Sequence, residues 1–208
     1  MGEAADIVRH GRKFDQVVDG ARQVFMADGF EGASVDDIAK VAGVSKATLY
    51  SYFPDKRLLF MEVATTECNR MADEALELIS ETAPAREALT IAASKLVPFL
   101  LSDFSQSVFR ICVAERDRFP ELGRAFYAAG PKMGHDRLTE YLRGAVERGE
   151  LNIEDIDMAA DQFSELCKVK LWIRAILGIQ AEFTQSEIDS IIENAVDTFM
   201  ARFSAHSA

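Results

Sequence analysis

The sequence has little of what metal centres and disulfide scaffolds require. Its 208 residues include only three cysteines, three histidines and one tryptophan. Cysteines that are dispersed, odd in number and set in apolar periodic segments favour reduced core thiols over disulfides or a metal cage. The histidines are too far apart to form a metal site or to activate a nucleophile. We therefore expect no metal and no cofactor. The residues concerned are Cys68, Cys112, Cys167, His10, His135 and His206.

Long apolar runs are also missing. No run approaches the ~18 residues that a membrane-spanning helix needs. The first dozen residues carry Glu3, Asp6 and Arg9 and lack the apolar stretch of a signal peptide. These absences predict a cytoplasmic protein with no membrane partner.

Catalytic motifs are absent as well. The chain contains no G-x-S-x-G, H-E-x-x-H, P-loop or G-x-G-x-x-G pattern. Two acidic pairs, Asp36 with Asp37 and Asp155 with Asp157, lie where helices are expected to begin, and acids there stabilise the positive end of a helix dipole. We expect a protein that is not an enzyme.

The net charge of -11 argues against nucleic-acid binding, because phosphate binding depends on Lys and Arg. Its distribution matters more. Residues 1–60 hold eight Lys and Arg against nine Asp and Glu, whereas residues 61–208 hold fifteen against twenty-five. Residues 40–57 form a small basic patch that could face DNA, and the acidic remainder would oppose non-specific binding. The charged residues of this patch are Lys40, Lys46, Lys56, Arg57 and Asp55.

Apolar residues recur at helical spacing in nearly every segment, and no segment shows the sustained alternation of a strand. The sequence therefore predicts an all-α fold. The first helix carries its apolar face from Phe14 to Phe25 and ends at Asp28-Gly29. Pro98 is expected to kink one of the later helices. Those helices are expected at 55–80, 84–101, 105–117, 121–128, 131–149, 154–179 and 185–203.

Residues 34–52 have the spacing of two short helices joined by a tight turn. Ser34 and Ser45 can each cap a helix, and Gly43 supplies the break between them. Pro54 ends the unit. In a DNA-binding helix-turn-helix, the second helix enters the major groove. Its exposed side chains here would suit phosphate and base contacts, although a solvated face without DNA fits the spacing equally.

The stretch 29–56 reads GFEGASVDDIAKVAGVSKATLYSYFPDK and closely resembles the DNA-binding domain of the TetR/AcrR family. The resemblance implies a homodimeric regulator, usually a repressor, whose small-molecule ligand changes its affinity for operator DNA. It implies a helix-turn-helix domain over 1–55 and a helical ligand-binding and dimerisation domain over 56–208. Ala47 and Ser51 stand where the family often has glycine and histidine, which leaves the operator sequence open. The implied DNA contacts are Ser34, Ser45, Lys46, Ala47, Thr48, Tyr50, Tyr52 and Lys56.

Two C-terminal segments resemble the AefR-like branch of this family. They read FRICVAERDRFPELGRAFY at 109–127 and VERGEL at 146–151. Pockets in helical regulators lie between helices and are mostly apolar. Ordinary core packing is the alternative for the aromatic candidates, and pairing with Glu115 or Glu121 on a solvated face is the alternative for Arg116. The ligand-binding candidates are Phe99, Phe104, Cys112, Arg116, Phe126 and Trp172.

The last expected helix has an apolar stripe wide enough to face more than one neighbour. Together with the helix before it, the stripe could build a four-helix interface across a two-fold axis. Packing within the subunit is the alternative. The predicted interface residues are Leu166, Ile173, Leu177, Ile188, Ile191, Ile192, Val196 and Phe199.

A helical interaction protein that has lost DNA binding is the second function class, suggested by the low net basicity. The presence of Lys46, Tyr50, Tyr52 and Lys56 at the matching positions argues against it. The sequence thus predicts a ligand-responsive, homodimeric, sequence-specific repressor.

Overall fold

The computed structural model describes residues 11–78 and 83–205, with the side chains of 75–78 excepted. Every regular element in these ranges is helical, and one isolated antiparallel bridge joins Leu151 to Ser204. The predicted all-α fold is confirmed. His10, His206 and the acids near the N-terminus lie outside the described residues.

The chain forms two compact units that are not consecutive in sequence. The first consists of Met1–Glu67 together with Ser107–Phe126, and the second of Cys68–Gln106 together with Tyr127–Ala208. The segment 107–126, which we expected to belong with the C-terminal part, thus packs with the N-terminal helices. The functional division at residues 55 and 56 stays a prediction.

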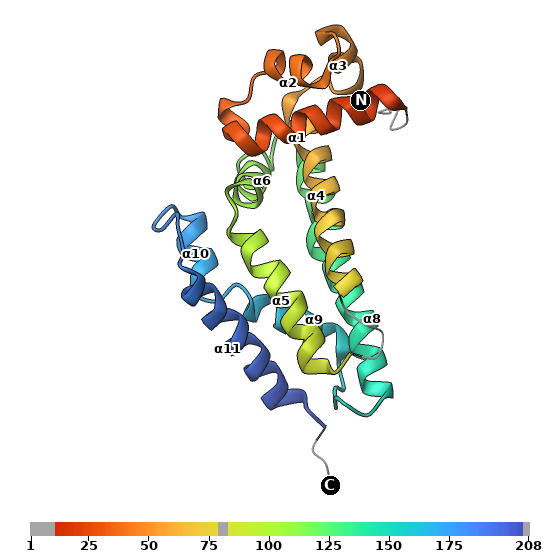
Figure 1. Cartoon of the computed structure of the whole chain (residues 1–208), viewed down its shortest axis with the longest axis vertical. Coiled ribbons are helices and arrows are strands. Elements are labelled where there is room, and N and C mark those ends of the chain that lie inside the picture. The colour runs from red at the N-terminus through yellow and green to blue at the C-terminus, as the bar shows by residue number, and fades with distance from the viewer. Residues whose placement is uncertain (1–10, 79–82, 206–208) are drawn as a thin grey trace. The chain divides into compact units, whose positions relative to one another are not determined.

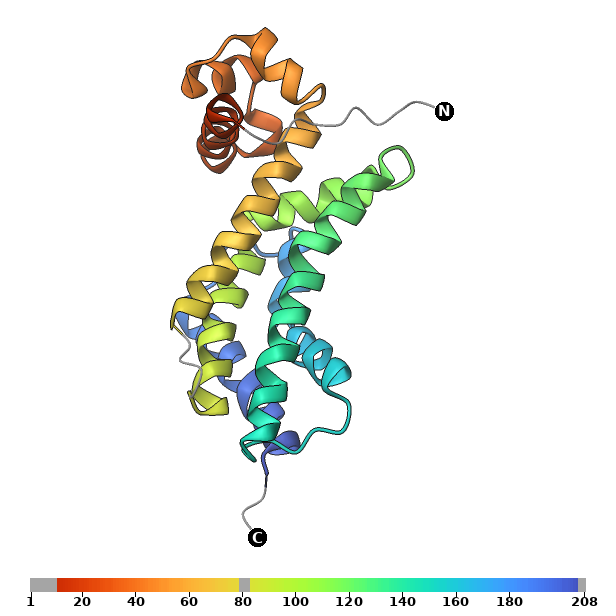
Figure 2. The same ribbon diagram turned by 90° about the vertical axis from the view of Figure 1, so that its right-hand side faces the viewer.

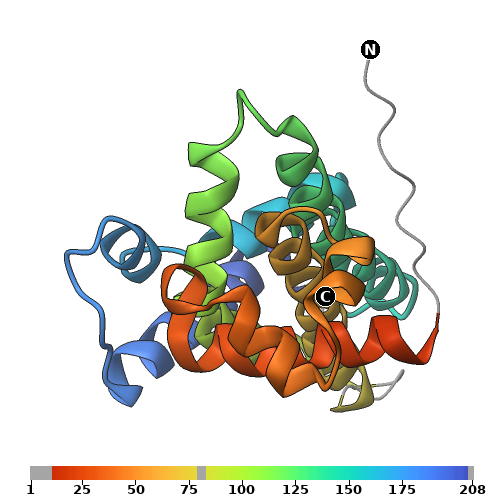
Figure 3. The same cartoon turned by 90° about the horizontal axis from the view of Figure 1, so that it is seen from above.

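Three helices open the first unit: α1 (Arg12–Gly32), α2 (Val35–Ala42) and α3 (Lys46–Tyr52). Helix α1 packs against α2, and α2 against α3 (Figure 1 and, from above, Figure 3). Gly20 allows the first contact, because a Cβ there would lie 2.7 Å from the backbone nitrogen of Ala42. The expected break near Asp28-Gly29 is a kink at Gly29, whose φ is 69°.

The rest of the first unit comes from three further helices: the start of α4 (Lys56–Leu78), most of α6 (Asp103–Ala114) and most of α7 (Pro120–Tyr127). An aromatic cluster fixes α4 to the end of α1. The ring of Phe60 lies 4.8 Å from that of Phe25 and 5.0 Å from that of Phe30. Because Phe25 and Phe60 are fully buried, this cluster sets where α4 leaves the helix-turn-helix.

The second unit contains α5 (Ala85–Leu101), a π-helical turn η1 (Ala128–Lys132), α8 (Met133–Glu147), α9 (Ile156–Leu166), α10 (Leu171–Ile176) and α11 (Gln185–Phe203). Helix α11 lies against α5 and α9 (Figure 1), and α8 lies beside α9 (Figure 2). Phe163 of α9 meets Phe199 of α11 edge to face, with 5.3 Å between ring centroids.

Most helix boundaries agree with the sequence within a few residues, but the helix predicted over 154–179 is wrong. It is broken into α9 and α10. At Lys170 the backbone has φ 67° and ψ -49°, so the Leu171 N–H turns to the carbonyl of Val169, 2.7 Å away. Pro98 lies inside α5, which continues to Leu101.

Among the described residues, no single helix is long and apolar enough to cross a membrane. Helices α5 and α6 would pass that test only as a bent pair counted together.

Candidate functional site

The helix-turn-helix is fixed by short local hydrogen bonds. The Ser34 hydroxyl accepts from the Asp37 N–H at 3.1 Å, and the Ser45 hydroxyl accepts from the Thr48 N–H at 3.1 Å. Between the helices, Gly43 adopts φ 64°, a left-handed conformation that glycine tolerates without strain. The predicted caps and turn are confirmed, and together they orient the seven-residue helix α3.

Helix α3 has a buried side and an exposed side. Leu49 is buried and anchors the helix, whereas Lys46, Ala47 and Ser51 are exposed and Tyr50 is 49% exposed. The outward face therefore presents an amine, a phenol and hydroxyl groups, which are donors and acceptors suited to phosphates and base edges.

Lys46 forms an ion pair with Asp36 of α2. Both side chains are more than half exposed, so water screens the pair and it contributes little to stability. The Lys46 ammonium therefore stays accessible to anions in solvent, with the Asp36 carboxylate beside it.

Two further predicted contacts, Tyr52 at the end of α3 and Lys56 at the start of α4, have partners inside the protein. The Lys56 ammonium donates to the carbonyl oxygens of Phe30 at 2.7 Å and Ala33 at 3.0 Å, and lies 4.3 Å from the centre of the Phe30 ring. Tyr52 is half-buried, with its ring 5.7 Å from that of Phe14. Lys56 thus holds the connection between α1 and α2, a role that the sequence did not indicate.

Arg57, which we counted in the basic patch, is also occupied. Its guanidinium donates to Asp55 at 2.9 Å, pairs with Glu115 at 2.7 Å and lies 4.4 Å from the centre of the Phe119 ring. The hydrogen bond from Arg57 lowers the pKa of Asp55, and that bond raises the pKa of Arg57. Arg57 therefore ties the start of α4 to the turn after α6, and Lys40 and Lys46 carry the basic character of the exposed surface.

The six ligand-binding candidates are divided between the two units. In the first unit, Cys112 is buried, and its thiol lies 3.8 Å from the Met61 sulfur. Burial raises the pKa of this thiol to about 11, so it is unreactive at neutral pH. The half-buried Phe126 packs edge to face on Phe109, with 6.2 Å between ring centroids.

Arg116 lies on the surface of the first unit. Its side chain is 75% exposed and pairs with Asp117 at 3.3 Å, rather than with Glu115 or Glu121. The solvated-face alternative is therefore the better one for Arg116. In the second unit, Phe104 is buried, and Phe99 and Trp172 are half-buried.

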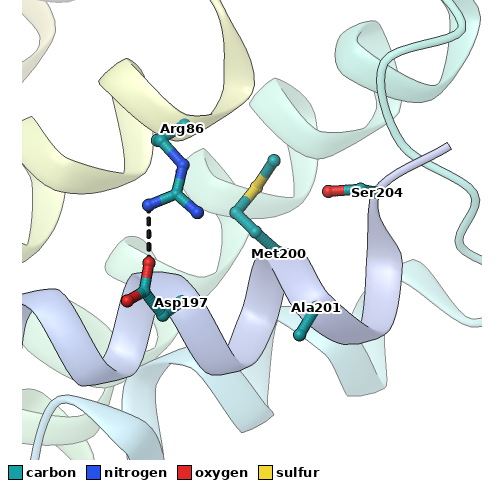
Figure 4. Close-up of a pocket in the computed structure, with 5 residues that line it drawn as sticks. All are labelled: Arg86, Asp197, Met200, Ala201 and Ser204. Carbon is teal, nitrogen blue, oxygen red and sulfur yellow. Dashed lines mark hydrogen bonds and ion pairs between the residues drawn. The ribbon is translucent and has the colours of Figure 1, made fainter. Parts of the chain in front are cut away.

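Two open hollows lie on the second unit. One, of about 360 Å³, is lined by α11 and by Arg86 of α5, whose ion pair with Asp197 measures 2.6 Å (Figure 4). The other is a groove of about 580 Å³ between α9 and α11. None of the six ligand-binding candidates lines either hollow.

The eight predicted dimer residues divide into two groups. Four of them, Ile191, Ile192, Val196 and Phe199, are buried against α5 and α9, so this part of the stripe packs within the subunit. Leu166 and Ile188 are half-buried, and Ile173 and Leu177 are 49% and 66% exposed. In or near α9 and α10, three further apolar residues that were not among the predicted ones are also exposed: Met158, Val169 and Ile179.

His135 links α8 to α9. Its Nδ1 lies 2.9 Å from Asp161 and its Nε2 lies 3.3 Å from Asp157. These hydrogen bonds, that to Asp161 above all, raise the pKa of His135. Among the described residues, no group of three His, Cys, Asp or Glu side chains could hold a metal ion.

Two family models match this chain. Residues 17–63 match the model described as "Bacterial regulatory proteins, tetR family". Residues 87–205, more than half of the chain, match "AefR-like transcriptional repressor, C-terminal domain".

Curated relatives are similar over part of their length. The fatty acid metabolism regulator protein of Bacillus subtilis (strain 168) is 30% identical over 96 residues, 46% of this chain and 50% of the relative. The HTH-type transcriptional repressor AcnR of Corynebacterium efficiens is 34% identical over 62 residues, 30% of this chain and 33% of the relative. The chain thus spans half or less of the length of these relatives.

Solved structures are similar over nearly the whole chain. The flavonoid-responsive regulator FrrA has a TM-score of 0.70 and 35% identity, with 95% of this chain and 100% of that chain covered. A TetR-family regulator from Mesorhizobium loti MAFF303099 has a TM-score of 0.78 and 27% identity, with 93% and 97% covered.

Proposed function

Because this chain belongs to the tetR family of bacterial regulatory proteins, we propose that it is a ligand-responsive, homodimeric repressor that binds operator DNA in the cytoplasm. The observation that carries the proposal is the exposed face of α3, which two serine caps and Leu49 hold in place. In the proposed division of labour, residues 1–55 bind DNA and residues 56–208 bind the effector and the second subunit.

In this proposal α3 enters the major groove, with Lys46, Ala47 and Tyr50 nearest the DNA. Two copies related by a two-fold axis would place their α3 helices in successive major grooves, about 34–36 Å apart. Few free cations and an acidic second unit make non-specific binding weak. Most of the affinity would then come from base contacts and shape.

Five other proposed DNA contacts also have a structural role in the first unit. They are Ser34, Ser45, Thr48, Tyr52 and Lys56. Each of these five has a hydrogen bond or ring contact inside the first unit. We propose that the hydroxyl groups touch phosphate while keeping their caps, since an oxygen has spare lone pairs. Lys56 acts instead by fixing the connection between α1 and α2.

For the effector, we propose a small organic molecule bound among the helices of the C-terminal part. FrrA, which is similar to nearly all of this chain, is named as flavonoid-responsive. Phe99, Phe104, Phe126 and Trp172 remain candidates as aromatic surfaces for such a molecule. Binding would lower operator affinity by favouring a dimer whose α3 helices no longer fit the groove spacing.

The test is selection of bound duplexes from a random DNA pool at near-physiological salt, with Tyr50→Ala as a parallel sample. A palindromic consensus that the variant fails to enrich would support the proposal. No enrichment by an intact dimer would contradict it and favour the interaction protein without DNA binding.

A further inference from the structure

An ion pair joins α2 and α3, the two helices of the helix-turn-helix (Figure 1). Lys46, the first residue of α3, pairs with Asp36, the second residue of α2. The two side chains are 58% and 64% exposed, so the pair lies on the surface and not in the packing between the helices. Because water screens exposed pairs, this one contributes little to stability, and both charges can be reached by a ligand from solvent.

Capping of α2 does not explain an acid at position 36. The neighbouring Asp37 accepts a hydrogen bond from the Ser34 hydroxyl, and its N–H donates to that oxygen at 3.1 Å. Asp37 thus belongs to the cap and also supplies the negative charge that the start of a helix favours. The Asp36 carboxylate lies across the turn beside Lys46 instead. Its position suits a role shared with α3.

The pair lies at the end of α3 that would read DNA. In a DNA-binding helix-turn-helix, the N-terminal residues of the second helix contact base edges. Lys46 is the first residue of α3, and the exposed Tyr50 follows one turn later on the same side of the helix. The ion pair brings the Asp36 carboxylate to the same place. An acid from α2 would therefore enter the groove together with the amine of α3.

An amine and a carboxylate side by side match the edge of a G·C base pair. In the major groove, guanine presents two adjacent acceptors, N7 and O6, and cytosine presents a donor, the N4 amine, beside them. The Lys46 ammonium can donate to guanine while the Asp36 carboxylate accepts from cytosine. In an A·T pair the donor lies between two acceptors, so the match is poorer. Both charges keep a partner on a G·C pair when water is removed.

A phosphate is the other partner that DNA offers to Lys46, and Asp36 opposes it. A phosphate that approached the ammonium would also meet the carboxylate, which has the same sign of charge. Lys56 and Arg57 do not compensate, because their side chains are held by partners inside the first unit. The pair therefore favours contact with bases over contact with the DNA backbone.

We propose that Asp36 and Lys46 together read one G·C base pair in each operator half-site, with Lys46 donating to guanine and Asp36 accepting from the N4 amine of cytosine. The inference rests on the proposed function as a DNA reader. It adds to that function a specificity-determining residue on α2 and the base pair that this residue selects.

The first test is selection of bound duplexes by the parent, by Asp36→Ala and by Asp117→Ala as the matched control. Asp117 is likewise the acid of an exposed ion pair in the first unit, but it lies outside the helix-turn-helix. The parent and the control should fix a G·C pair at one position of each half-site. Asp36→Ala should accept other base pairs there about tenfold more readily and leave the other positions unchanged. An unchanged consensus for Asp36→Ala would overturn the inference.

The second test removes the cytosine amine alone. In the selected duplex, the fixed cytosine is replaced by pyrimidin-2-one, which lacks the N4 amine. Affinity should fall about tenfold for the parent and for Asp117→Ala, and hardly at all for Asp36→Ala, which has already lost the contact. An equal fall for all three proteins would overturn the inference.

Two further outcomes are distinct. If Asp36→Ala binds the selected duplex and its pyrimidin-2-one form more tightly by the same factor, the carboxylate acts by repulsion alone, and the inference is overturned while the DNA reader stands. If the intact parent dimer enriches no sequence at all, the proposed function itself is contradicted.

Discussion

The chain turns sharply at two residues with nearly the same φ, Gly43 at 64° and Lys170 at 67°. At Gly43 the residue suits the conformation, and the Val44 N–H closes the turn onto the Ala39 carbonyl at 3.0 Å. At Lys170 the side chain makes the same φ costly, and burial of neighbouring residues holds the turn. The first turn is fixed by local sequence and orients α3, whereas the second depends on packing and can change when the packing does.

The largest expected effect is a loss of stability when a side chain is placed at Gly43, because the first turn then carries backbone strain like that at Lys170. In Gly43→Ala, a Cβ at φ 64° costs about 1–2 kcal/mol of unfolding free energy. No atom lies within 4 Å of that Cβ, so the cost comes from the backbone alone. Urea unfolding of the variant beside the parent measures it. If the variant is as stable as the parent, a side chain at this φ causes no strain, and the two turns do not differ as described.

The next largest effect concerns operator affinity. The first turn orients the exposed face of α3, and substitutions on that face should weaken binding. Tyr50→Ala and Lys46→Ala should each weaken binding to the selected duplex about tenfold, which corresponds to about 1.4 kcal/mol, since each removes a contact to the DNA. Dimerisation should stay intact. Arg116→Ala is the matched control, because it removes an exposed cation of the first unit outside the helix-turn-helix. If Arg116→Ala weakens binding as much as Lys46→Ala, the surface is wrongly placed.

Replacing Lys170 by glycine should change stability in the opposite direction to replacing Gly43 by alanine. At concentrations low enough for single chains, Lys170→Gly should raise the free energy of unfolding by about 1 kcal/mol, because glycine adopts positive φ without strain. Lys170→Ala should not. Thermal unfolding of both variants checks this, and a destabilised glycine variant would contradict the strained turn.

The smallest effect concerns pH. Contact with Asp161 and Asp157 raises the folded pKa of His135, so its stabilising contribution is complete below the unfolded value of about 6.5 and is lost as pH rises through the folded pKa. Stability measured from pH 5 to 8 should show this loss in the parent and not in His135→Gln. An identical pH profile for the two would rule out the contribution.

The helix-turn-helix could be predicted from the sequence because its determinants are local. Ser34, Gly43 and Ser45 act on residues within four positions of themselves. The partners of Lys56 and Arg57 could not be predicted in the same way, because Phe30 and Glu115 lie 26 and 58 positions away in the sequence. A count of basic residues therefore overstated the surface available to DNA.

The C-terminal part was harder to predict because a helical stripe does not say which neighbour covers it. Part of the α11 stripe proved to face α5 and α9, whereas several apolar residues in or beside α9 and α10 stay exposed. The buried residues are Ile191, Ile192, Val196 and Phe199, and the exposed ones are Met158, Val169, Ile173, Leu177 and Ile179. Lys170 carries no turn signal of its own, so the break there could not be read from residue type.

The most direct test of a dimeric reader is affinity for the selected operator as its two half-sites are moved apart. If two α3 helices are held by one dimer, inserting five base pairs should abolish tight binding, because it turns one half-site to the opposite face of the duplex, and inserting a full helical turn should restore only part of it. Equal affinity for the parent and the five-base-pair insertion would contradict a dimer that reads both half-sites at once.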